Sequence, residues 1–131
     1  MSNTFELSWM SAAELAERIR NRELSPVEVM ESTLERIERI NPKINAFCTM
    51  VPEMARAAAR EAEEAVMKGE RLGPLHGVPV GIKDTEATAG VRTAPAGARP
   101  LLWPPDWFPS PLGEIMLDPS EFRLPCAVYM A

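Results

Sequence analysis

Residues 77–84 read G-V-P-V-G-I-K-D, an apolar run that ends in a lysine. Continuous apolar runs of this kind are typical of strands that are buried on both faces of a sheet. Side chains alternate along a strand, so the larger apolar residues share one face, which we expect helices to cover. This face consists of Val78, Val80 and Ile82. The opposite face is small until it reaches Lys83, which leaves room above Gly81 for a ligand or another backbone.

Lys83 admits two hypotheses at this position. In the first, the lysine ends the strand in solvent and has no chemical role. In the second, it is a general base, because ligands of open α/β sheets bind beyond the carboxyl ends of the strands. A lysine accepts a proton readily near pH 7 only if its pKa lies about 3 below the usual value of about 10.4. Burial and hydrogen bonds to the neutral amine can produce such a lysine.

Three amphipathic helices are predicted before this strand, over about residues 11–21, 25–41 and 52–68. The first two begin with S-x-x-E capping boxes, and the second also has proline at its first helical position. The second helix is expected to stop just before Pro42. The stretch I-N-A-F-C-T-M-V at 44–51 is short and alternating, which predicts a strand. Helices and strands in this order indicate an α/β architecture.

The composition of the chain changes after residue 94. Residues 95–131 hold eight of the 13 prolines and no lysine, and prolines interrupt both helices and strands. We therefore expect an irregular tail. Two interpretations stay open: the tail is a loop that packs on a part of the fold outside this chain, or it is a sequence foreign to the fold. The aromatic side chains of the tail include Trp103, Trp107 and Phe108. If these side chains are exposed, they favour self-association of the chain.

The overall composition argues against several classes of function. The chain has 131 residues, the length of one domain, and its net charge of −5 argues against contact with nucleic acid. A zinc site of the usual type is not expected, because His76 is the only histidine and Cys48 and Cys126 lack metal-ligand spacing. No apolar run reaches the roughly 18 residues that cross a bilayer, so no membrane segment is expected. The N-terminus lacks the pattern of a secretory signal, which makes the cytoplasm the default expectation.

Several stretches of the first 94 residues resemble the amidase signature family in order and spacing. They are M-S-A-A-E-L-A-E-R-I-R, E-L-S-P-V-E-V, E-R-I-E-R-I-N-P-K-I-N-A-F, and above all G-P-L-H-G-V-P-V-G-I-K-D followed by A-T-A-G-V-R-T. The resemblance covers about residues 8–94 and implies an α/β fold. The chain would hold the N-terminal helices and the first strands of the family's mixed sheet, which would be incomplete here. Members of this family hydrolyse amides or release ammonia from an amide for transfer.

The same resemblance implies a catalytic triad of serine, cis-serine and lysine, without metal or cofactor. The lysine of the G-V-P-V-G-I-K-D segment is Lys83, which would be the general base. The family's serines lie in a Gly-Gly-Ser-Ser-Gly-Gly-like stretch, and this sequence contains none. Beyond residue 94 the only serines are Ser110 and Ser120, and neither has such glycines around it. His76 is an alternative base by residue type, but we expect it to be a loop residue. No substrate-binding residue can be assigned.

Two functional hypotheses follow. In the first, residues 1–94 are the N-terminal part of an amidase-like α/β domain that acts on a small-molecule amide. The 131-residue chain would then be a truncated fragment that is inactive alone, with residues 95–131 as a tail outside the family match. In the second hypothesis the chain is a non-catalytic interaction module that docks on a full-length homologue or a partner subunit.

Overall fold

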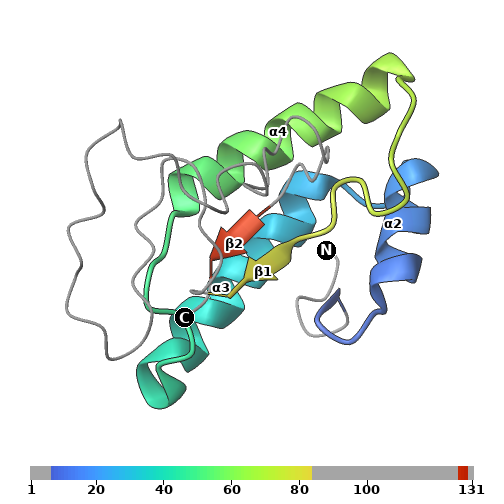
Figure 1. Ribbon diagram of the computed structural model, residues 1–131. Coiled ribbons are helices and arrows are strands. Elements are labelled where there is room, and N and C mark those ends of the chain that lie inside the picture. Colours follow the sequence, from blue (N-terminus) through green and yellow to red (C-terminus); the bar gives the residue numbers. More distant parts are fainter. Residues whose placement is uncertain (1–6, 84–126, 130–131) are drawn as a thin grey trace, which may run out of the picture.

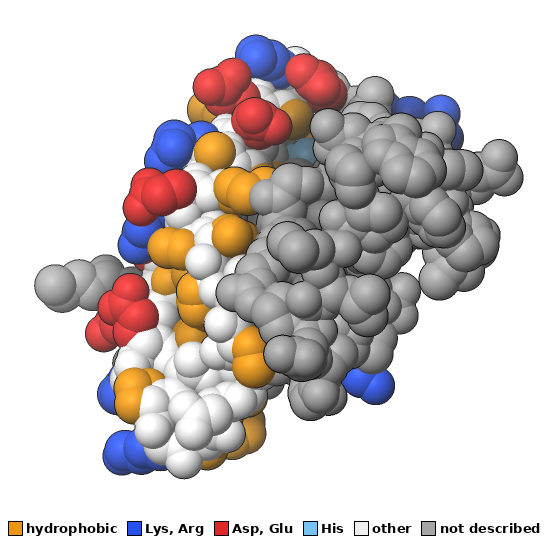
Figure 2. Space-filling view, turned by 60° about the vertical axis from the view of Figure 1, so that its left-hand side comes forward, with side chains coloured by type: hydrophobic (Ala, Val, Ile, Leu, Met, Phe, Trp, Pro, Cys, Tyr) orange, Lys and Arg blue, Asp and Glu red, His pale blue; other side chains and the backbone are white. Residues whose placement is uncertain are grey.

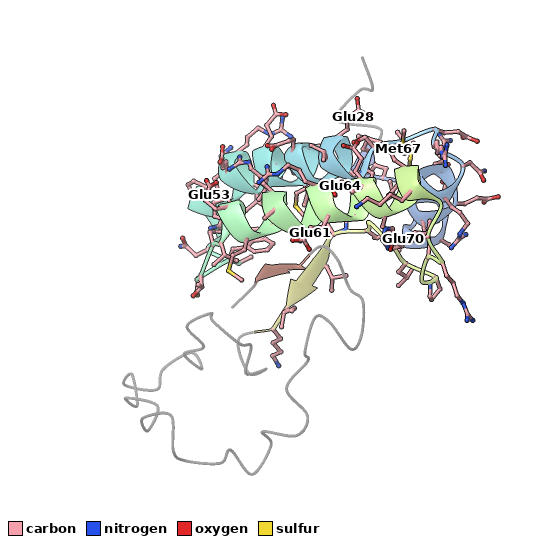
Figure 3. All side chains as sticks on the ribbon, turned by 90° about the horizontal axis from the view of Figure 1, so that it is seen from above. Glu28, Glu53, Glu61, Glu64, Met67 and Glu70 are labelled. Carbon is pink, nitrogen blue, oxygen red and sulfur yellow. The ribbon has the colours of Figure 1, made fainter. Side chains whose placement is uncertain are left out.

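The computed structural model describes residues 7–83 and, for the backbone, residues 127–129. Its elements follow the order α2 (Ala12–Arg20), α3 (Pro26–Ile44), α4 (Pro52–Lys68), β1 (Val80–Ile82) and β2 (Ala127–Tyr129). Helices α3 and α4 run antiparallel and side by side, with α2 at one end of the pair (Figure 1). Seen from above, the helices form one layer and the strand pair lies on one side of it (Figure 3). The mixed α/β arrangement expected from the sequence is present.

The N-termini of α2 and α3 lie where the capping boxes predicted them. Ser11 Oγ accepts a hydrogen bond from the backbone N–H of Glu14 at 3.2 Å. Ser25 Oγ accepts from the N–H groups of Val27 and Glu28, at 3.0 and 3.3 Å. These bonds satisfy N–H groups that have no partner within the first helical turn.

Helix α3 runs past the predicted stop at Pro42 and ends at Ile44, so this boundary was wrong. Pro42 lies in the last turn of α3, two residues before the helix ends. Its missing N–H removes one backbone hydrogen bond, and hardly any helix follows that the proline ring could distort. The turn is held from outside by Asn41, whose Nδ2 donates to Phe47 O at 3.0 Å while its Oδ1 accepts from Phe47 N at 2.9 Å. The helix then ends at Asn45, which adopts the left-handed conformation with φ 49°.

The strand predicted over residues 44–51 is also wrong. Ile44 is the last residue of α3, and residues 45–51 form an irregular connection to α4. Phe47 and Met50 are half-buried and pack against the core between α3 and α4. The apolar residues of this stretch therefore belong to a loop that packs two side chains against the helices. Tertiary packing of this kind overrides a short β-propensity signal.

Helix α4 approaches α3 closely because its buried face consists mostly of alanines. The shared core is formed by Met30, Leu34, Ile37, Ala55, Ala59 and Ala62. Gly69, in the left-handed conformation with φ 71°, ends the helix. Both ends of α4 thus lie at the predicted positions.

The outer faces of the helices are charged. Nε of Arg56 on α4 donates to Glu31 Oε1 on α3 at 2.8 Å, and this hydrogen bond and the charge of Glu31 raise the pKa of Arg56. Figure 2 shows acidic and basic side chains along one edge of the described surface, beside a band of hydrophobic ones. Five glutamates are labelled in Figure 3: Glu28 on α3, Glu53, Glu61 and Glu64 on α4, and Glu70 just after α4. None of the helices in the described residues is long and apolar enough to span a membrane.

Strand β1 confirms the predicted strand but is shorter, covering Val80–Ile82. Val78 precedes it and is 5% exposed, in a core formed mainly with α2 and its neighbours. This second core contains Leu7, Leu15, Ala16, Ile19, Leu24, Val29, Val66 and Val78. Val80 and Ile82 are half-buried, so helical cover is strongest where the strand begins. Asp84, the last residue of the predicted strand, lies outside the described residues.

Strand β2 comes from the segment expected to be an irregular tail. Ala127–Tyr129 pairs in parallel with β1, with Val80 opposite Ala127 and Ile82 opposite Tyr129. At these three residues the expectation of irregular structure does not hold. The other residues of the tail, including its tryptophans, lie outside the described part of the chain.

We expect Ser25→Ala to lower the free energy of unfolding by about 1–3 kcal/mol. Besides capping α3, Ser25 Oγ donates to the carboxylate of Glu63 on α4, so the substitution removes a cap and a link between helices. Ser11→Ala is the control, because Ser11 is exposed and its Oγ only caps α2; about 0.5–1 kcal/mol is expected. Urea denaturation followed by circular dichroism measures both. Equal losses would show that the Ser25–Glu63 link contributes nothing.

Candidate functional site

Lys83 directly follows β1, at the carboxyl end of the strand. Its side chain is exposed, and the ion pairs found in the described part of the chain involve other residues. Ligands of open α/β sheets bind beyond such strand ends. The site therefore consists of an accessible amine on a short strand, and the segments around the strand determine where the amine lies.

Gly77 is the point at which the chain enters the strand. Its φ is +79°, a left-handed conformation that side chains disfavour. A Cβ at this position would lie 3.1 Å from Pro26 Cγ and 3.2 Å from two carbons of Ile19. The turn thus packs directly against the start of α3 and the end of α2, which determines where β1 begins.

Two arginines near the end of α2 bind the connection between α4 and β1. Arg22 Nη2 donates to Val66 O, a carbonyl in the last turn of α4, at 3.2 Å. Arg20 Nη2 lies 3.4 Å from both Gly73 O and Pro74 O. Val66 O and Gly73 O also accept from the backbone N–H groups of Gly69 and His76, so each guanidinium group adds a second donor to a carbonyl that can accept two. The last turn of α4 and the middle of the connection are therefore both held by side chains from the end of α2 and the residues just after it.

His76 attaches the same connection to α4. Its Nε2 lies 2.9 Å from Ala62 O, and because a carbonyl can only accept, Nε2 carries the proton. The half-buried ring lies in the turn over residues 74–77, which agrees with the expectation of a loop residue. The contact has an evident structural role, since it fixes the turn that precedes Gly77.

Of the serines and cysteines considered from the sequence as site residues, Cys48 alone lies in the described part of the chain. Ser110, Ser120 and Cys126 lie outside the described residues. Cys48 is an exposed free thiol in the connection between α3 and α4. Within residues 7–83 and 127–129, no group of three histidine, cysteine or acidic side chains could hold a metal ion.

The residues that position β1 were missed by sequence reasoning. A glycine at the start of an apolar run often marks a turn, and Gly77 could have been singled out by this signal. Arg20 and Arg22 carry no such signal, because their carbonyl partners lie about fifty positions away in sequence.

Comparison with known proteins supports this arrangement. A sequence profile described as Amidase matches residues 28–99. The chain is 49% identical over 88 residues to a glutamyl-tRNA(Gln) amidotransferase subunit of Carboxydothermus hydrogenoformans, covering 67% of this chain and 18% of that protein. It is 44% identical to the putative amidase AmiD of Mycobacterium bovis, with the same coverage. A bacterial aryl acylamidase of the amidase signature enzymes superposes with a TM-score of 0.56 and 42% identity, over 58% of this chain and 16% of that one.

Capped helices layered against a strand that ends in a lysine therefore define the N-terminal part of an α/β fold of the amidase signature type. The chain belongs to the Amidase family, whose profile matches more than half of it. It spans 18% of the length of the two curated relatives described above.

Proposed function

We propose that this chain is the N-terminal part of an amide-hydrolysing enzyme and that Lys83 is the general base. The observation that carries the proposal is the position of Lys83, at the end of the strand formed by the family's G-V-P-V-G-I-K-D segment. The amidase and acylamidase relatives support hydrolysis of a carbon–nitrogen bond in a small-molecule amide.

Lys83 is exposed in the described part of the chain, so in this mechanism the residues that complete the site would bury its amine. The amine then takes a proton from a bridging serine, which in turn deprotonates a nucleophilic serine. The nucleophile attacks the amide carbonyl, backbone N–H groups stabilise the oxyanion, and the proton passes to the leaving amine. The chain supplies only the base. Its sequence has no Gly-Gly-Ser-Ser-Gly-Gly-like stretch, so both serines and the oxyanion donors would come from residues outside it.

The proposal is tested by complementation. The chain is co-expressed with the C. hydrogenoformans relative shortened by its 88 matching residues, and ammonia release is measured from aliphatic and aromatic amides. We expect turnover from the pair and none above buffer from either part alone. Lys83→Ala and Lys83→Arg should each lower turnover by at least about 100-fold, because neither supplies a neutral amine.

Lys68→Ala is the matched control, since Lys68 is an exposed lysine on α4 that forms an ion pair with Glu64, one turn away on the same helix. Its turnover should stay unchanged. Full activity in Lys83→Ala would contradict the role of Lys83. Turnover by the 131-residue chain alone would place a nucleophile within it, at Ser110 or Ser120.

The interaction-module hypothesis rests on a different observation, at the end of α3. Ile44 lies seven residues after Ile37 and so on the same helical face. Ile37 is 7% exposed in the core, whereas Ile44 is 60% exposed. The apolar face of α3 thus extends beyond its cover in the described residues. Stable binding of the chain to the shortened relative, without turnover, would favour this function, and Ile44→Glu should then weaken the binding.

A further inference from the structure

The edge of β1 carries an inference that does not depend on the proposed function. In the described residues the hydrogen-bonded neighbour of β1 is β2, and residues 83–126 separate the two strands in sequence. The Amidase profile ends at residue 99, so β2 lies outside the family match. The strand that pairs with the family's lysine-bearing segment therefore comes from the non-matching part of this chain.

The sequence of β2 suits this position. The chain ends in P-C-A-V-Y-M-A, and after Pro125 it contains no proline, unlike the residues before it. Valine and tyrosine favour strands. A three-residue parallel pair is marginal by itself. Here it is supported by α4, which contacts β2, so the helix layer covers the strand pair on one side (Figure 3).

We propose that the edge of β1 is a strand-docking site and that its occupant is the chain's own β2, Ala127–Tyr129. The site takes an extended, apolar segment in parallel, by main-chain hydrogen bonds between the strands. If main-chain pairing and the cover by α4 hold β2 in place, a separate peptide that contains the β2 sequence binds the edge of β1 once β2 has been removed. The occupant is thus part of the fold, and the foreign-tail interpretation does not apply to these residues.

Amide hydrogen exchange of residues 80–82 measures occupation of the site. We expect Val128→Pro to speed exchange at these residues at least tenfold, because proline removes a strand donor. Ser120→Pro is the matched control outside the pair and should leave the exchange unchanged. A chain shortened after Pro125 should show the same loss of protection, and an added peptide of residues 126–131 should restore it. Unchanged exchange in Val128→Pro and in the shortened chain, or failure of the peptide to restore protection, overturns the proposal.

A cysteine pair identifies the occupant. Gly81 lies opposite Val128 and does not have a positive φ, so Gly81→Cys combined with Val128→Cys places two thiols across the strands. In a Cys48→Ser, Cys126→Ser background we expect oxidation to form a disulfide within one chain. The pair Gly81→Cys with Glu28→Cys is the control, because Glu28 is exposed on the side of the helix layer away from the strands (Figure 3), and it should stay reduced under the same mild oxidation. A disulfide between two chains would overturn the assignment of the site to the chain's own segment and indicate a second copy.

Discussion

Gly77→Ala is expected to lower the free energy of unfolding by about 2–5 kcal/mol, a large share of the 5–15 kcal/mol typical of a domain. Two effects add. The left-handed φ of +79° costs a side-chain-bearing residue about 1–2 kcal/mol. The new Cβ would also press on Pro26 and Ile19 at 3.1–3.2 Å, and overpacking of this kind costs about 1–3 kcal/mol.

Two further glycines separate these effects. Gly69 has φ +71° and Gly73 does not have a positive φ, and neither has an atom within 4 Å of an added Cβ. Gly69→Ala should therefore cost about 1 kcal/mol, and Gly73→Ala should lie within about 0.5 kcal/mol of the unchanged protein. Urea midpoints at constant m-value measure all three. If Gly69→Ala costs as much as Gly77→Ala, the close contact with α2 and α3 does not contribute.

The second large effect is expected from Met30→Ala, at about 2–5 kcal/mol. Met30 is 0% exposed between α3 and α4, where the facing residues are mostly alanines. Small neighbours with helical backbones can move little, so a cavity would remain where the methionine was. Thermal or urea unfolding followed by circular dichroism measures the loss.

Met67→Ala provides the matched control, because the same atoms are removed from a side chain that is 63% exposed on α4. We expect a change within about 0.5 kcal/mol. Similar losses at both positions would mean that the α3–α4 interface is not a packed core, and the alanine face of α4 would need another explanation.

The helix starts were predictable because capping is local. A serine at the N-cap bonds N–H groups two or three residues away, so the S-x-x-E pattern contains both partners of the interaction. The helix stop and the strand predicted over 44–51 failed for the opposite reason. Asn41 and Phe47 hold the last turn of α3 through side-chain bonds across a loop, and the apolar residues of the loop pack on helices. Neither contact is encoded in a short window.

The position of Lys83 at the end of a strand was also predicted, since the apolar run and its lysine are contiguous. The chemistry assigned to Lys83 stays a proposal, because it depends on serines outside this sequence. Contiguous residues could not show what holds the strand. Arg20, Arg22 and His76 bind carbonyls of distant segments, and Gly77 has no room for a side chain because of Pro26 and Ile19.

The sequence by itself determined three amphipathic helices, two of them with serine caps, an apolar strand followed by Lys83, and the family to which these segments are similar. Tertiary structure alone decided where that strand lies and which strand pairs with it, since β2 comes from a part of the chain expected to be irregular. The physical reason is the range of the interactions. Caps and periodic faces are set by neighbours within a few residues, whereas strand pairing and close packing join segments whose approach depends on the whole fold.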